Sequence, residues 1–189
     1  MDGQPVLVDA GTYLYHAGGQ WRSFFRGTSA HNTLCVEKTG ASTMSGNFNW
    51  ARKAHAGLIS SEYGKEEWQV EAEHDGYRKN FGTVHRRTLV ITPASGFTVE
   101  DTLSGKSPRH VDIGFLIHPS LTLAHNGKSF EIRSNRQALL LIVHQGNLAT
   151  SIETGWHAPH FGEKLPAQRI VFSGMLALGE KAITRFYYL

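Results

Sequence analysis

The feature that most constrains the fold is the alternation of apolar and polar residues with a period of two. Residues 68–72, 97–100 and 111–113 alternate in this way, so one face of each segment can be buried while the other stays in water. Residues 84–91 are a further candidate strand, with alternate residues on opposite faces. Almost no segment keeps the i, i+3, i+4, i+7 spacing that is typical of an amphipathic helix. The apolar run at 139–143 alternates poorly and indicates a strand covered on both faces.

Turn-forming residues separate these segments at a spacing of about 8–14 residues, which is typical of antiparallel sheets. The chain has 189 residues and 40% hydrophobic content, enough for one packed core. We therefore predict a single all-β domain over residues 1–189, an antiparallel two-sheet β-sandwich with ten or more strands. Residues 21–56 form a long segment without a clear pattern, and such segments on β scaffolds often carry function.

The composition argues against two classes of partner. The net charge is +3 with eleven histidines counted as neutral, and no Lys/Arg-rich block is interleaved with aromatic residues, so we expect no nucleic-acid binding. The longest apolar run, 138–143, is far shorter than the roughly 20 residues that a membrane-spanning helix needs, so we expect no membrane insertion. Cys35, the single cysteine, lies between Leu34 and Val36 and is interpreted as a small buried hydrophobic residue.

Two pairs of residues are candidates for a functional site. Asp9 ends a short apolar strand, and His31 follows the unpatterned Trp-Arg-Ser-Phe-Phe-Arg segment. Carboxylate and imidazole are ordinary zinc ligands that need a third partner, although a turn cap and a hydrogen-bonded structural histidine are the alternative interpretations. Arg22 and Arg26 are candidates to bind a substrate carboxylate or sulfate, the alternative being solvated arginines packed on aromatic neighbours.

An ordered set of short motifs resembles the heparinase II/III-like polysaccharide lyases. The set comprises D-A-G-T-Y at 9–13, R-G-T-S-A-H-N-T at 26–33, H-D-G-Y at 74–77, V-E-D at 99–101, F-L-I-H-P at 115–119 and G-W-H-A-P-H-F-G at 155–162. Each motif is modest, but together they follow the family order and cover nearly the whole chain.

The resemblance implies a fold, an activity and a partner. Members of this family join a helical toroid to a β-sandwich and depolymerise uronic-acid-containing polysaccharides by β-elimination. The chain is therefore expected to be the carboxy-terminal β domain of a lyase, with the α/α-toroid that should precede it missing from this sequence. Its expected partner is an acidic polysaccharide, which could be a glycosaminoglycan, an alginate or a bacterial exopolysaccharide, and the family favours a periplasmic or secreted location.

The resemblance also implies a zinc or similar divalent metal in the β domain. Asp9 and His31 match two of its ligand positions, whereas the third ligand and a neighbouring catalytic histidine belong to an H-x-H motif that residues 1–8 do not contain. Some related alginate lyases have a tyrosine where Phe24 and Phe25 stand here. We therefore expect an incomplete metal site and no useful turnover by the chain alone, and we assign it no catalytic residue.

Several other residues have plainer interpretations. We expect structural roles for His74, Tyr77 and His118, an ordinary loop around His157 and His160, and either packing or sugar stacking for Trp156. Two rival functions stay open. One is a non-catalytic carbohydrate-binding or scaffold module; the other is a cupin-like metalloenzyme, which is disfavoured because the sequence has no His-x-His.

Overall fold

The structure is a computed structural model, and it describes residues 3–16, 19–127, 129–135 and 137–189. The described residues group into two compact units, each assembled from segments that are far apart in the sequence. The first unit contains a four-stranded sheet, and the second contains an eight-stranded sheet.

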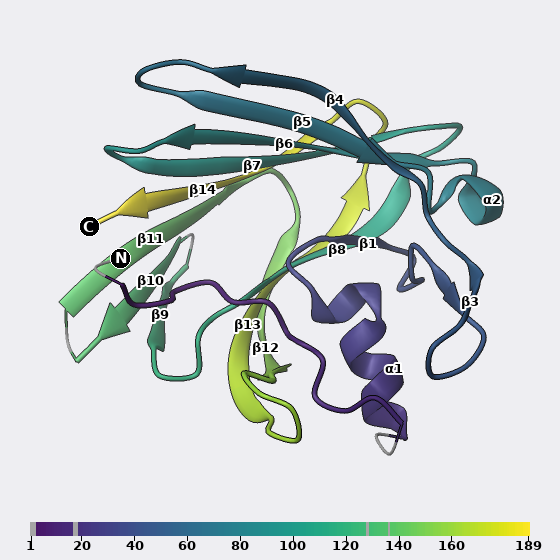
Figure 1. The fold of residues 1–189 in the computed structure, drawn as a ribbon. Helices are drawn as coiled ribbons and strands as arrows, with labels where there is room; N and C mark the ends of the chain where they lie inside the picture. Colours follow the sequence, from purple (N-terminus) through teal and green to yellow (C-terminus); the bar gives the residue numbers. More distant parts are fainter. Residues whose placement is uncertain (1–2, 17–18, 128, 136) are drawn as a thin grey trace. The chain divides into compact units, whose positions relative to one another are not determined.

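The sheet of the first unit is antiparallel where its register is defined (Figure 1). Its strand order is β1 (Leu34–Val36), β8 (Arg109–Leu116), β13 (Leu165–Leu176) and β12 (Ala149–His157). Ile170 and Phe172 on β13 are fully buried, whereas their neighbours Arg169, Val171 and Ser173 belong to the opposite face by strand alternation. A small hairpin of β2 (Thr43–Met44) and β3 (Trp50–Arg52) belongs to the same unit.

The first unit contains one short α-helix and one 3₁₀ turn among its described residues. Helix α1 (Gln20–Arg26) is followed directly by the 3₁₀ turn η1 (Thr28–Ala30). Trp21, Phe24 and Phe25 lie at i, i+3 and i+4, so they share one face of α1. This face packs on a small core that contains Ala10, Leu116 and Ala158.

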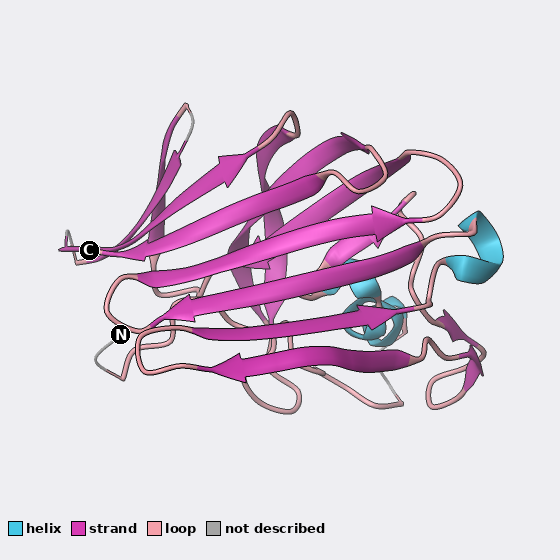
Figure 2. Cartoon of the chain, turned by 90° about the horizontal axis from the view of Figure 1, so that it is seen from above, coloured by secondary structure: helices cyan, strands magenta, loops and turns pink. Residues whose placement is uncertain are grey.

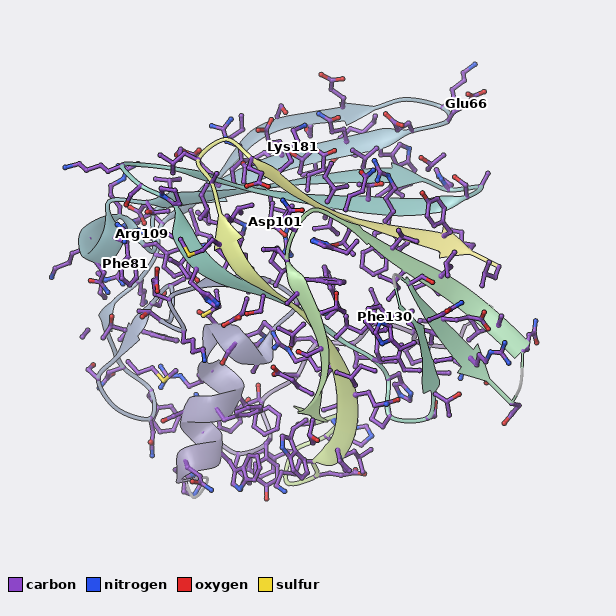
Figure 3. The ribbon with its side chains drawn as sticks, turned by 180° about the vertical axis from the view of Figure 1, so that it is seen from behind. Glu66, Phe81, Asp101, Arg109, Phe130 and Lys181 are labelled. Atoms are coloured by element: carbon purple, nitrogen blue, oxygen red, sulfur yellow. The ribbon has the colours of Figure 1, made fainter. Side chains whose placement is uncertain are left out.

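The second unit is built on one long antiparallel sheet, whose strands Figure 2 shows side by side. The strand order is β4 (Ala56–Tyr63), β5 (Trp68–His74), β6 (Val84–Thr92), β7 (Gly96–Ser104), β14 (Lys181–Tyr188), β11 (Gln137–Gln145), β10 (Ser129–Ser134) and β9 (Thr122–Asn126). A one-turn helix, α2 (Arg78–Phe81), connects β5 to β6. Arg109 anchors this helix, because its Nη2 donates to the Phe81 carbonyl at 2.9 Å (Figure 3).

The apolar residues of the second unit alternate along its strands as the sequence predicts. Phe130 and Ile132 on β10, Ile142 on β11 and Phe186 on β14 are at most 1% exposed. Phe186 pairs with Phe97 in register, and their rings stack with centroids 4.3 Å apart. Stacked cross-strand aromatic pairs of this kind stabilise a sheet beyond the area that they bury.

The predicted strands are confirmed, and the described residues contain little helix, as the sequence indicates. Segments 68–72, 84–91, 97–100, 111–113 and 139–143 all lie in strands, and the fold contains more than ten strands. The unpatterned segment 21–56 contains most of α1 and all of η1. A seven-residue helix is too short to show its period over a dozen residues, so the sequence pattern does not indicate it. None of the helices in the described ranges is long and apolar enough to cross a membrane.

Candidate functional site

Asp9 is positioned by an extended segment that runs beside the end of β8. The Val8 amide donates to the Leu116 carbonyl at 3.0 Å, and the His118 amide donates to the Val6 carbonyl at 2.9 Å. The chain then turns at Gly11, whose amide donates to Asp9 Oδ2 at 2.8 Å. The carboxylate is thus fixed at the end of a paired segment.

Gly11 is required at this turn for two reasons. Its φ is +80°, a region that side-chain-bearing residues rarely adopt. A Cβ atom at this position would also lie 2.4 Å from the Ala158 carbonyl oxygen, with which the segment forms a bridge. The D-x-G-T-Y motif therefore describes a turn that packs tightly against the loop after β12.

His31 follows η1, and its ring meets the Asp9 carboxylate. His31 Nδ1 and Asp9 Oδ1 are 2.6 Å apart. The hydrogen bond to Asp9 raises the pKa of His31 against the opposing effect of burial, and the same bond lowers the pKa of Asp9. The side chains are 35% and 62% exposed respectively, so both remain accessible to a ligand.

Asn32 holds these two segments together. Its side-chain Nδ2 donates to the Val8 carbonyl at 3.0 Å, and its Oδ1 accepts from the Leu116 amide at 2.7 Å. One amide side chain thereby joins the Asp9 segment, the His31 turn and β8. In the A-H-N motif, His31 contacts Asp9, and Asn32 holds the two contacting segments in place.

Replacing Asn32 with alanine is expected to lower the free energy of unfolding by about 1–2 kcal/mol, because it leaves the Leu116 amide and the Val8 carbonyl without this partner. Urea unfolding of the chain measures the loss. Asn80→Ala, at an exposed position of α2, is the matched control and should change stability by less than about 0.5 kcal/mol. Equal losses in the two variants would show that Asn32 does not hold these segments together.

Two further histidines lie beside the Asp9 turn. His157 Nδ1 donates to the backbone carbonyl of Asp9 at 2.8 Å, and its ring centroid is 5.8 Å from that of His118. His118 accepts a hydrogen bond from the Ser120 amide, which is consistent with the structural role expected for it. The loop around His157 is thus directly attached to the candidate site, a connection that no spacing in the sequence indicated.

The structure places Arg22 and Arg26 against the loop that connects β2 to β3. Arg22 Nε donates to the Asn47 carbonyl at 2.9 Å, and Arg26 Nη1 donates to the Gly46 carbonyl at 2.6 Å. The Arg26 guanidinium also lies 4.2 Å from the centre of the Trp50 ring. These contacts match the packing alternative, and substrate contact by either arginine stays a prediction.

Trp156 packs rather than standing free. Its ring centroid is 5.0 Å from that of Trp21 at an interplanar angle of 74°. Lys164 Nζ lies 4.1 Å from the Trp156 ring centre and 4.2 Å from that of Trp21, close enough for cation–π attraction. The indole is therefore part of the aromatic cluster that supports α1.

The donor set of the Asp9–His31 pair fits part of a zinc site. Carboxylate oxygen and imidazole nitrogen are both zinc ligands, and here two of them converge on an accessible surface. Among the described residues, no group of three His, Cys, Asp or Glu side chains is arranged to hold a metal ion. Asp9 and His31 alone would thus hold a metal weakly, and a tight site would need at least one further ligand.

Comparison with known families decides the relationship of the chain. The model of the family described as "Heparinase II/III-like, C-terminal" matches residues 1–185. The chain belongs to this family. No curated protein sequence matches it.

Solved structures of family enzymes share the fold. A heparinase III gene product with methylated lysines has a TM-score of 0.81 at 16% identity and is matched over 100% of this chain and 28% of its own. Heparan sulfate lyase HepC from Pedobacter heparinus has a TM-score of 0.80 at 17% identity, over 98% of this chain and 29% of its own. A heparinase III crystal structure has a TM-score of 0.77 at 22% identity, over 100% and 28%.

These similarities confirm the antiparallel two-sheet β-sandwich predicted for this family member. The chain spans less than a third of the length of each solved relative. It corresponds to the C-terminal part of heparinase-like proteins, which contain further chain before it.

Proposed function

We propose that this chain is the β domain of a polysaccharide lyase that cleaves uronic-acid-containing polysaccharide by β-elimination. In this proposal Asp9 and His31 supply part of a metal site, and the surrounding surface forms one wall of the substrate cleft. The observation that carries the proposal is the 2.6 Å contact between these side chains, held by Asn32 within the A-H-N motif of a heparinase II/III-like domain.

The chemistry explains why a second domain is needed. Elimination at a uronate requires a base for the C5 proton, an acid for the leaving oxygen and donors that neutralise the carboxylate. A bound divalent metal would supply positive charge to polarise substrate oxygen or to order the site. Asp9 and His31 would hold the metal, while the proposed helical domain would supply the remaining catalytic groups.

The enzymatic test uses the longest natural polypeptide that contains this chain. It is incubated with heparan sulfate, alginate and a bacterial exopolysaccharide, and the ultraviolet absorbance of the unsaturated uronate product is followed. We expect turnover of at least one acidic substrate when a helical domain is present and none by residues 1–189 alone. Turnover of none of the uronic-acid polymers by the longer protein would contradict the proposal.

A non-catalytic carbohydrate-binding module is a second candidate, favoured by a row of exposed aromatic side chains. Tyr15 stacks on Phe161 with centroids 5.7 Å apart and on Phe48 at 6.5 Å, and the three side chains are 49%, 65% and 61% exposed. Exposed rings of this kind can pack on the apolar face of a sugar. Saccharide affinity of the chain that survives the combined loss of Asp9 and His31 would favour this candidate.

A further inference from the structure

A cavity in the first unit lies over the Arg169 face of its four-stranded sheet. Its volume is about 420 Å³, within the range of small-molecule sites, and residues from β1, β8, β12 and β13 line it. Cross-strand pairing brings these residues together, since Cys35 pairs with Asp112 and Glu153 pairs with Arg169. The cavity therefore follows from the register of the sheet.

Arg169 is a buried cation in the lining of this cavity. It is 7% exposed, and its Nε has no hydrogen-bond partner among the described residues. Burial lowers the pKa of its guanidinium, although the neighbouring Glu153 raises it. Nε itself is shielded, so the part of this cation available to a ligand is the rest of the guanidinium at the cavity wall.

The sheet is adapted to hold this guanidinium. A Cβ atom at Gly114 would lie 1.8 Å from Arg169 Nη2 and 2.0 Å from its Cζ, so the planar group rests directly on the backbone of β8. A long-range contact to the His31 carbonyl, 3.4 Å from Nη2, completes its surroundings. Glycine at 114 thus makes room for a charged side chain on a sheet face.

A second cation enters from a tight turn. Glu37 and Lys38 have φ values of +49° and +53°, a region where glycine and asparagine are favoured, and the Thr39 amide closes the turn on the Val36 carbonyl at 2.8 Å. Lys38 also lines the cavity. Positive φ at both central residues is the geometry of a tight two-residue hairpin turn, and this turn places Lys38 in the cavity lining.

The remaining polar groups restrict the ligand. Hydroxyl groups of Ser29 and Ser151 and the carboxylates of Asp112 and Glu153 also line the cavity, and Asp112 accepts from Ser173 at 2.5 Å. Two carboxylates disfavour a multiply charged anion such as phosphate or sulfate. They suit a ligand with one negative charge and several hydroxyl donors.

We propose that this cavity binds one acidic sugar residue, with its carboxylate at Arg169 and Lys38 and its hydroxyl groups at Glu153 and the serines. The site is separate from the Asp9 and His31 side chains, and it would hold a polysaccharide without taking part in the elimination. The choice of a uronic acid rests on the proposed function, whereas the cavity and its charges do not.

The test is a titration of the full chain with D-glucuronate, followed by amide chemical shifts and compared with D-glucose and sulfate. We expect saturable glucuronate binding that is about five-fold or more weaker in Lys38→Gln and Arg169→Lys. Lys53→Gln, at an exposed site in the same unit and not in the cavity lining, is the matched control and should leave the affinity unchanged. Because Arg169 is buried, Lys38→Gln decides the outcome if Arg169→Lys does not fold.

Three results would overturn the inference: no saturable binding, affinity unchanged by Lys38→Gln, or equal affinity for glucose or sulfate. An Asp9→Asn variant separates this site from the proposed metal site. This variant should bind zinc at His31 less tightly than the parent chain and should bind glucuronate with unchanged affinity. The two proposals can therefore fail independently of each other.

Discussion

Replacing Asp101 with asparagine is expected to lower the free energy of unfolding by about 3–5 kcal/mol, because it removes a buried negative charge that pairs with both Arg87 and His85. Asp101 is 1% exposed and lies on β7 (Figure 3). Its Oδ1 accepts from Arg87 Nε at 2.8 Å, and its Oδ2 accepts from Arg87 Nη2 at 2.9 Å. Burial opposes ionisation of Asp101, but Arg87 and His85 lower its pKa well below the ordinary value.

The same carboxylate orders a chain of two histidines. The Gly76 amide can only donate, so His74 Nδ1 accepts from it at 3.2 Å. We therefore assign the proton of His74 to Nε2, which donates to His85 Nδ1 at 3.1 Å, and His85 Nε2 donates to Asp101 Oδ1 at 2.6 Å. The asparagine amide cannot neutralise Arg87, and it can satisfy this chain of donors only in part.

Chemical unfolding of Asp101→Asn beside Glu100→Gln measures the effect. Glu100 is the adjacent residue on β7, and its ion pair with Lys181, 2.7 Å long, is partly exposed. Its loss should cost less than about 1 kcal/mol. Similar destabilisation by the two changes would contradict a special role for the buried cluster.

The second large effect is a loss of stability as the pH falls from 6.5 to 4. Burial, and then the neighbouring His85, lower the pKa of His74 from 6.5 to about 4. Asp75, Arg87 and Asp101 are the other charged groups that act on it. Between these two pH values His74 binds more protons in the unfolded chain than in the folded one, so its contribution to the free energy of unfolding falls as the pH falls.

His74 should contribute on the order of 2–3 kcal/mol to this loss. His144, whose pKa burial also lowers to about 4, adds a contribution of the same sign. His31 acts with the opposite sign, because its raised pKa makes the folded chain gain stability as the pH falls through 6.5, and this offsets part of the loss. Unfolding free energies at pH 7, 5.5 and 4.5 should therefore fall less steeply in His74→Gln than in the parent chain, and identical slopes would show that His74 is not buried in its neutral form.

The His74–His85–Asp101 cluster shows which structural features could be predicted from the sequence and which could not. Alternation predicted the strands that carry His85 and Asp101, and the H-D-G-Y motif predicted a turn at His74. The bonds among them depend on the pairing of β5 with β6 and of β6 with β7, which places His74 opposite His85. Register of this kind cannot be derived from the period of one strand, because it depends on three segments at once.

Some residues of the candidate site could likewise be predicted from the sequence, and others could not. The resemblance brought Asp9 and His31 together before any geometry was known, and the structure places them in contact. The roles of Asn32 and His157 depend on distant backbone carbonyls, and nothing in their own neighbourhood signalled them. The burial of Arg169 could not be predicted either, because an arginine in an apolar strand is normally assigned to the solvent-exposed face of that strand.

The most direct test of the account is a zinc titration of residues 1–189, followed through the ring-nitrogen resonances of the histidines. His31 should respond at lower zinc concentration than His125, an exposed histidine on β9, because the Asp9 carboxylate lies beside His31 as a second ligand. Asp9→Asn should abolish this preference. A His31 signal that responds no earlier than His125, or a preference that survives Asp9→Asn, would contradict a metal site at this pair.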